Sequence, residues 1–330
     1  MSKFKKWLKK DYIKKRLKDA FYASGVVLVS WMSYHTLVGT QVTTLQHPPL
    51  SSSYKICFTG DTGTGEEGQR KIASYLKKEK CNELRILGDI IYPHGLADEN
   101  DSLFHTKFWD MYSDLNIPIY LTMGNHGNRR NIGSWIRLAE NYDLIKFPYY
   151  FYAEKFGNEV CFLSLNTTAY TTIIKGTHEK DQNEFVKKTL KEFKENCKFS
   201  IVMGHHPYLS FGSHGDAGGR LKRFYKKLIV GRVDLIIGGH DHNLGYDGQV
   251  AGTHNIVSGA GSKLRVPSKY KNLDKSNPIS TKRGWVNFNL GYHVMSYLGE
   301  GKAEFVEKYI KDGKLIENPT KIVIEGKGVR

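Results

Sequence analysis

Five stretches of this 330-residue chain repeat one pattern: a short apolar run, then glycine, then a polar side chain able to bind a metal. A short, continuous apolar run is typical of a strand that is buried on both faces. A glycine after it lets the backbone turn sharply and approach a ligand. Since ligands of open α/β sheets bind beyond the carboxyl ends of the strands, we expect the five ends to form one site. The stretches are 56–61, 84–92, 119–126, 201–206 and 235–242.

Helical and extended patterns alternate along most of the chain. Segments 67–78, 132–142, 180–196 and 220–229 have helical spacing, whereas 147–152 and 160–165 read as strands. Beyond His242 the pattern is mostly extended, through 255–258, 285–290, 293–298 and 303–309. Mixed strand and helix units followed by hairpins predict an α/β fold with two packed sheets and helices outside them.

The first 53 residues differ in composition from the rest. Residues 1–19 form a basic head with nine Lys/Arg and two acidic residues, a net charge of +7, and 20–54 contain no charged side chain. This pattern predicts an export signal or a membrane anchor over 20–45, with an amphipathic surface helix as the alternative. Since positive flanks stay in the cytoplasm, the chain beyond it should be exported. Residues 46–53 read as a linker to a domain at 54–330.

Net charge and cysteine content narrow the function classes. The chain carries a formal charge of +16, but outside the basic head the excess is scattered among acidic residues. No aromatic and basic nucleic-acid motif occurs, so we expect no nucleic-acid partner and a domain that attracts anionic substrates. The four cysteines are too far apart in sequence for a metal site. Cys57 and Cys161 read as core residues, and Cys81 and Cys197 are the candidates for a disulfide.

The polar residues after the strands are oxygen and imidazole donors. Such a mixed set favours Zn, Fe or Mn over Ca or a thiolate site. Six donors exceed the number that one structural metal usually takes from a protein. Two metals bridged by one carboxylate would use all six and would activate water for attack at phosphorus. Asp89 is central in the order and is our candidate for the bridge; the set is Asp61, Asp89, Asn125, His205, His240 and His242.

At these residues the sequence resembles the calcineurin-like metallophosphoesterases, and more narrowly the purple, tartrate-resistant acid phosphatases. The family has five ordered blocks, which are similar to 60–63, 88–92, 124–126, 202–205 and 239–243 here. The narrower resemblance rests on Gly63, where most of the superfamily has histidine, on Tyr92, and on segments 98–104 and 257–261. It covers about 55–261 and implies a four-layer α/β/β/α sandwich of two mixed β-sheets flanked by helices.

The resemblance also implies the metals and their ligands. It assigns Fe(III) to Asp61, Asp89, Tyr92 and His242, and Fe(II), Zn or Mn to Asp89, Asn125, His205 and His240. The chemistry of tyrosine agrees, because a phenol with a pKa of about 10 gives up its proton only to a strongly acidic cation such as Fe(III).

Two further histidines match residues that contact the phosphate in this family. By resemblance, His126 and His214 are catalytic and help to protonate the leaving oxygen. Gly127 departs from the family pattern because an acidic residue usually follows Gly-Asn-His, so an orienting partner for a histidine is missing. His206 reads as a structural neighbour of the metal ligands.

The combined reading is an exported enzyme, periplasmic, extracellular or lumenal, attached to the membrane if its N-terminal segment is retained. We expect a binuclear metal-dependent phosphohydrolase in which metal-bound hydroxide attacks small phosphate monoesters. One alternative is a phosphodiesterase or nucleotide hydrolase of the same superfamily. Another is a catalytically weak, membrane-tethered protein that keeps its metals for structure.

Overall fold

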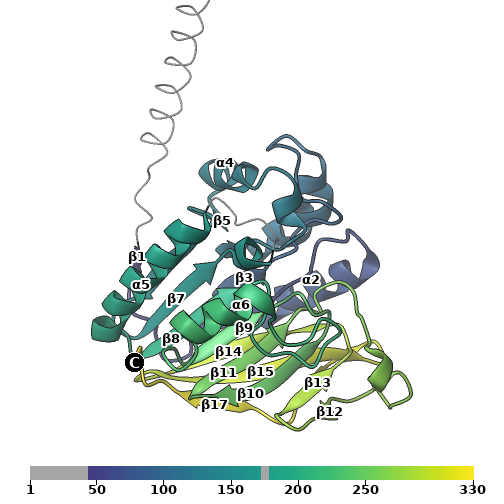
Figure 1. The fold of residues 1–330 in the computed structure, drawn as a ribbon. Helices are drawn as coiled ribbons and strands as arrows, with labels where there is room; N and C mark the ends of the chain where they lie inside the picture. Colours follow the sequence, from purple (N-terminus) through teal and green to yellow (C-terminus); the bar gives the residue numbers. More distant parts are fainter. Residues whose placement is uncertain (1–43, 172–177) are drawn as a thin grey trace, which may run out of the picture. The chain divides into compact units, whose positions relative to one another are not determined.

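The computed structural model describes residues 44–171 and 178–330, which belong to one compact unit, Thr44–Arg330. The basic head and nearly all of the expected signal or anchor at 20–45 lie outside these residues. Across 44–171 and 178–330, no helix is both long and apolar enough to cross a bilayer. Two mixed sheets, seen in Figure 1, form the centre of the unit.

The first sheet has eight strands and carries the first three predicted strand ends. Strands β2, β3 and β4 lie side by side and parallel, so their carboxyl ends reach the same edge. Its order is β16 (Lys314–Glu317), β15 (Lys302–Lys311), β14 (Gly291–Gly299), β2 (Lys55–Thr59), β3 (Glu83–Leu87), β4 (Ile119–Thr122) and β5 (Ile145–Lys146), with β17 (Ile322–Glu325) paired to β15.

The second sheet has nine strands and carries the other two predicted strand ends. Strands β7, β8 and β9 are parallel neighbours. The order is β1 (Thr44–His47), β6 (Tyr152–Phe156), β7 (Val160–Leu165), β8 (Phe199–Gly204), β9 (Leu235–Gly238), β11 (Thr253–Ser258), β10 (Leu244–Val250), β13 (Trp285–Asn287) and β12 (Ile279–Ser280).

Alternating side chains of the central strands build three packed interiors. In β2, Cys57 packs toward the helices while Ile56 and Phe58 pack into the core between the sheets. Successive strand residues face opposite sides, so a strand covered on both faces must be apolar throughout. Helices α2 (Glu67–Glu79), α3 (Asp110–Tyr112) and α4 (Gly133–Asn141) cover the eight-stranded sheet. Helices α5 (Glu179–Asn196) and α6 (Gly219–Phe224) cover the other, which confirms the four-layer α/β/β/α sandwich.

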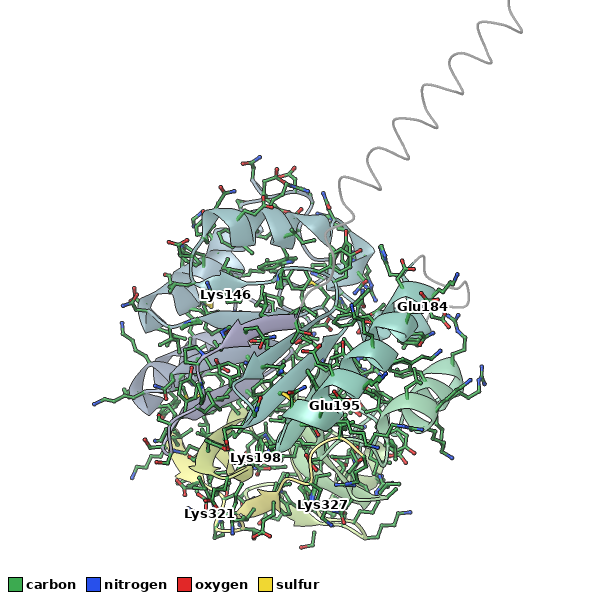
Figure 2. All side chains as sticks on the ribbon, turned by 90° about the vertical axis from the view of Figure 1, so that its left-hand side faces the viewer. Lys146, Glu184, Glu195, Lys198, Lys321 and Lys327 are labelled. Atoms are coloured by element: carbon green, nitrogen blue, oxygen red, sulfur yellow. A yellow bond between two sulfur atoms is a disulfide. The ribbon has the colours of Figure 1, made fainter. Side chains whose placement is uncertain are left out.

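Helix α5 illustrates why these segments are helical. Val186, Leu190 and Phe193 recur at helical spacing and are buried against the nine-stranded sheet. Glu184 and Glu195, labelled in Figure 2, are exposed on the outer face of the same helix. The apolar stripe therefore supplies the packing that holds the helix in place.

Three expectations about local structure were wrong. Gln46 and His47 belong to β1, which pairs with β6, and Leu50 is buried, so 46–53 is no free linker. The strand expected at 147–152 begins only at Tyr152, because the aromatic residues before it pack as a loop. Cys81 and Cys197 do not pair with each other.

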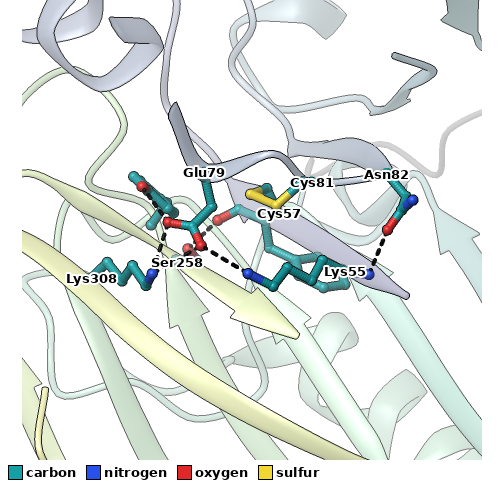
Figure 3. Close-up of a disulfide and its surroundings, with 9 residues drawn as sticks. Lys55, Cys57, Glu79, Cys81, Asn82, Ser258 and Lys308 are labelled. Atoms are coloured by element: carbon teal, nitrogen blue, oxygen red, sulfur yellow. Dashed lines mark hydrogen bonds and ion pairs between the residues drawn. A yellow bond between two sulfur atoms is a disulfide. The ribbon is translucent and has the colours of Figure 1, made fainter. Parts of the chain in front are cut away.

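Each strand cysteine pairs instead with the cysteine that precedes a neighbouring parallel strand. Cys57 of β2 is bonded to Cys81, ahead of β3, and Cys161 of β7 to Cys197, ahead of β8. Figure 3 shows the first bond, with Glu79 nearby between Lys55 and Lys308. Two disulfides favour an oxidising compartment and so support export.

A buried ion pair lies between the two sheets. The Arg85 guanidinium of β3 is 1% exposed and donates to Glu83 at 2.6 Å and to Glu154 of β6 at 2.7 Å. Its planar group also packs over the rings of Tyr120 and Phe162. The charge is therefore fully paired in an apolar interior and connects the sheets.

Replacing Arg85 should destabilise the domain strongly. Arg85→Met leaves Glu83 and Glu154 buried without the guanidinium that pairs with both of them, so the free energy of unfolding should fall by about 3–5 kcal/mol. Guanidinium unfolding of the oxidised protein measures this. Lys321→Met, which breaks an exposed pair with Glu304, is the control and should cost less than about 1 kcal/mol. Equal losses in the two variants would contradict a structural role for Arg85.

Candidate metal centre

The five strand ends meet at one edge of the sandwich. Asp61 follows β2, Asp89 follows β3 and Asn125 follows β4, while His205 and His240 follow β8 and β9 of the other sheet. The two sets join directly, because the backbone N–H of His240 donates to the Asp61 carboxylate at 2.7 Å. The geometry thus brings together residues that are 179 positions apart in the chain.

Three of these residues have an unusual backbone. Asp61, Asp89 and His240 have φ values of 56°, 49° and 67°, in the left-handed region that most residues avoid. Such a conformation costs free energy and persists only where the surroundings hold it. Here Asp61 donates its N–H to the Gly88 carbonyl, and the Asp89 carboxylate accepts the His126 N–H. The sharp turns direct the side chains away from the strand axes and into the centre.

Glycines let the segments approach closely. A Cβ on Gly124 would lie 2.1 Å from the Asp89 Oδ1, and one on Gly88 would lie 2.5 Å from the His205 ring. A Cβ on Gly63 would lie 2.0 Å from the Ile90 carbonyl oxygen, so no side chain fits there without moving the backbone that precedes Tyr92. Glycine at these positions is therefore required by the packing of the site.

Asp61, Tyr92 and His242 form one group of donors. The Tyr92 hydroxyl donates to the Asp61 Oδ1 at 2.9 Å and lies 3.3 Å from the His242 Nε2. The same His242 nitrogen lies 3.3 Å from the Asp61 Oδ1. Three donor atoms of different chemistry thus converge on one small volume.

Asp89, Asn125, His205 and His240 form a second group. The His205 Nε2 lies 3.3 Å from the Asp89 Oδ2, 3.0 Å from the Asn125 Oδ1 and 3.2 Å from the His240 Nδ1. The other ring nitrogen of His205 lies 2.9 Å from the Leu87 carbonyl oxygen, which fixes the orientation of the ring. All seven predicted ligands therefore lie in two adjoining groups.

The electrostatics of the centre call for positive charge. Burial raises the pKa of the Tyr92 phenol, and the carboxylates of Asp61 and Asp89 raise it further. Burial alone would lower the pKa of His205, but Asp89 outweighs it and raises the pKa to about 9. Ligand atoms of Asp61, Asp89 and His205 lie within 4.8 Å of one another. These residues fit metal cations, because two buried carboxylates, a phenol and several imidazoles supply the donors that such ions bind.

His126 has a backbone partner in place of the missing acidic residue. Its Nδ1 lies 2.5 Å from the Pro93 carbonyl oxygen, which orients the ring without help from position 127. The Nε2 lies 3.9 Å from the Asp89 Oδ2, at the edge of the centre. Beside it, the Gly127 backbone packs close to Gly95.

His214 is held by a loop that Asp241 anchors. The buried Asp241 accepts from the His214 N–H at 2.7 Å and from the Ser210 hydroxyl at 2.5 Å. The His214 ring stacks on that of His240 with centroids 4.2 Å apart. Since a guanidinium can only donate, the Arg265 Nη1, 3.1 Å away, requires the His214 Nε2 to accept.

Three contributors were missed by the sequence analysis. Asp241 lies between two predicted ligands, and the sequence analysis gave it no role of its own. Lys263 places its ammonium 3.4 Å from the centre of the Tyr92 ring, and partial burial lowers its pKa. Lys263 and Arg265 follow the glycine-rich segment 257–261, and that position was the available signal.

His206 and a pocket lie beside the second group of donors. The His206 backbone N–H and ring Nδ1 both contact the Thr167 hydroxyl, at 3.0 and 2.8 Å. His205, His206 and His240 also bring ligand atoms within 4.8 Å of one another. The pocket has a volume of about 650 Å³, and Asn125, His206, His214 and His240 lie along it.

Curated relatives of the chain are acid phosphatases. It is 28% identical over 242 residues to tartrate-resistant acid phosphatase type 5 of Sus scrofa, covering 67% of this chain and 68% of that protein. It is 25% identical over 270 residues to purple acid phosphatase 3 of Arabidopsis thaliana, covering 74% and 72%. The match thus spans about two thirds of the length of the mammalian relative.

Solved structures share the fold. GAP50, the anchor in the inner membrane complex of Plasmodium, has a TM-score of 0.68 at 19% identity, covering 84% of this chain and 90% of that one. The purple acid phosphatase PPD1 of Lupinus luteus has a TM-score of 0.59 at 16% identity, covering 84% and 55%.

The family model agrees with the five blocks seen in the sequence. Residues 54–244, more than half of the chain, match the model of the calcineurin-like phosphoesterases. This segment contains every candidate ligand from Asp61 to His242 and both candidate catalytic histidines. The family resemblance is thereby confirmed, and the chain belongs to the calcineurin-like phosphoesterases.

Proposed function

We propose that the protein is a binuclear metal-dependent phosphatase that hydrolyses phosphate monoesters. Family membership and the acid phosphatase relatives support a phosphoesterase. The observation that carries the finer proposal is the arrangement of seven donors in two adjoining groups. Asp89 contacts His205 within the second group, and its carboxylate raises the pKa of Tyr92 in the first group. It is therefore our candidate for the ligand shared by both groups.

Fe(III) is the cation proposed for the group of Asp61, Asp89, Tyr92 and His242. Burial and two carboxylates raise the pKa of Tyr92, so the phenol loses its proton only to a strongly acidic ion. Asp89, Asn125, His205 and His240 suit a divalent ion, Fe(II), Zn or Mn. Two such cations would lower the pKa of a water molecule and offset negative charge at the phosphate.

The protein's own side chains contribute binding and proton transfer. Lys263 and the pair of Arg265 with His214 border the donors and offer positive charge to phosphate oxygens. His126 keeps its Nδ1 on the Pro93 carbonyl, which leaves its Nε2 to carry a proton to the leaving oxygen. The Nε2 of His214 accepts from Arg265, so we assign His214 to phosphate contact and His126 to proton donation.

The proposal of an enzyme rests on the donor residues, because the fold alone does not establish a function. GAP50, which has the same fold, is described as an anchor in a membrane complex. A fold accommodates unrelated functions, so an enzyme must be argued from its site. A protein that kept its metals only for structure would bind them without turnover, and a phosphatase assay separates the two cases.

Asp89→Ala should remove metal and activity together. The purified wild type should contain two metals per chain and hydrolyse p-nitrophenyl phosphate faster than bis(p-nitrophenyl) phosphate. Asp89→Ala should lose at least one metal and nearly all turnover. His126→Ala, which removes no proposed ligand, should keep both metals and lower kcat by about 10²-fold. Metal analysis measures the metal content, and steady-state kinetics measure the turnover. An inactive wild type that contains two metals would contradict the proposal that the protein is an enzyme.

Tyr92→Phe should change colour more than metal content. A phenolate bound to Fe(III) gives a visible charge-transfer band, and phenylalanine cannot. The variant should therefore retain iron but lose the band in an absorption spectrum. Tyr112→Phe is the matched control, because this buried tyrosine belongs to the core cluster beside α2. A colourless, active wild type without iron would exclude the ferric assignment.

We also propose that the N-terminal segment directs export. The disulfides support an exported protein, and the compact unit begins at Thr44. The positive charge of the basic head should keep that end of the segment in the cytoplasm, so the domain that follows is placed outside it, whether the segment is cleaved or retained.

Deleting residues 1–43 should keep the domain folded but prevent export. The deletion ends before β1, so the pairing of β1 with β6 is preserved. The truncated protein should remain in the cytoplasm, whereas in the full chain the domain should be open to protease added from outside. Full-length protein found soluble in the cytoplasm with its N-terminus intact would contradict the targeting proposal.

A further inference from the structure

A second hollow continues from the pocket at the candidate metal centre. Tyr170 and Arg220 line that pocket together with Asn125 and His240. The same tyrosine and arginine also line a neighbouring pocket of about 390 Å³. A molecule held beside Asn125 and His240 can therefore extend past Tyr170 and Arg220 into the second pocket, which we call the basic groove.

The walls of the basic groove are two helical segments of the outer layer. Helix α5 contributes Glu179, Asn183 and Lys187, four residues apart and so on one face. Figure 1 shows α6 on the same side of the molecule as α5, and the π-helical turn η5 (Tyr225–Ile229) continues it. Arg220 and Lys227 on this segment lie about 10 Å apart along its axis.

The charge of the basic groove is strongly positive. Arg220 is held in place by Glu179, at 2.8 Å, and these two charges cancel. Lys187, Arg223 and Lys227 are exposed, and among the residues that the structure describes none of them forms an ion pair. The residues that line the groove therefore have a net charge of +3, which favours an anionic ligand.

The floor of the groove is rigid. The rings of Tyr170 and Phe224 stack with centroids 4.1 Å apart. The Tyr170 hydroxyl donates to the Asn183 Oδ1 at 3.1 Å and accepts from Gln182 at 3.0 Å, which connects the floor to α5. The basic side chains thus stand on helical segments that these contacts hold together, and not on separate loops.

We propose that the basic groove binds the additional phosphates of a substrate that carries several phosphate groups along a chain. The inference rests on the proposed phosphatase and specifies its substrate class. The terminal phosphate lies at the metal donors while the following phosphates contact Lys187, Arg223 and Lys227. In hydrolysis, water adds to the terminal phosphorus and the P–O bond to the next phosphate breaks. The leaving oxygen keeps the electron pair and takes a proton.

Charge removal in the groove should affect long substrates selectively. In the full-length, metal-replete protein, the triple variant Lys187→Gln, Arg223→Gln, Lys227→Gln should lose at least about 10-fold in kcat/KM for long-chain inorganic polyphosphate, since three exposed ion pairs are lost. Its kcat/KM for p-nitrophenyl phosphate should be unchanged. The matched control is Lys188→Gln, Lys194→Gln, Lys226→Gln, which removes the same charge from α5 and η5 outside the groove. Equal losses in both variants, or for both substrates, would overturn the inference.

A binding assay separates this inference from the proposed function. Fluorescein-labelled inorganic polyphosphate should bind the wild type and the control, with a logarithmic salt slope of about −2 for three phosphate contacts, and bind the groove variant weakly. Groove-dependent binding without turnover would uphold the groove and reject the phosphatase. Turnover of p-nitrophenyl phosphate with unchanged polyphosphate binding in the groove variant would reject the groove alone. A variant that loses binding only to phosphatidylglycerol vesicles would assign the groove to a membrane surface and also overturn the inference.

Discussion

The buried carboxylates of Asp61 and Asp89 set the main constraint on this structure. They lie at the ends of adjacent parallel strands, at most 2% exposed, where two negative charges are unstable without cations nearby. Histidines from the second sheet approach them, and Tyr92 donates a proton into the same space. The two sheets must therefore meet at this edge, and the site depends on the sandwich being closed.

That closure is reinforced away from the site by Arg85. Its guanidinium pairs with carboxylates on both sheets, two strand positions before the turn that carries Asp89. A displacement of β3 would move Arg85 and Asp89 together. The interior ion pair and the candidate metal donors therefore depend on the position of the same strand. This arrangement explains how a strained backbone at Asp89, with a φ of 49°, is kept in place.

The sequence predicted the centre of this fold better than its margins. Buried parallel strands such as 235–237 have a continuous apolar pattern, and the polar residues at their ends followed from it. Edge strand β1 was missed because its four residues carry no such pattern and are held only by pairing with β6. The disulfide partners were wrong because strand order in space, not spacing along the chain, brings Cys57 to Cys81. Lys263 and Arg265 reach the site because a loop places them there, and hydrophobic periodicity does not predict the path of a loop.

Asp241 connects the two groups of donors to the loop that carries His214. Its neighbours in sequence, His240 and His242, lie with different groups of donors, while its own carboxylate holds the loop of His214. That loop leads through Gly218 into α6, whose first turn presents Arg220. The loop of His214 and helix α6 thus connect the donors to the basic groove along one short stretch of chain. In the function that we propose, substrate selection and metal binding would therefore depend on the same segment, and a change at Asp241 would disturb both.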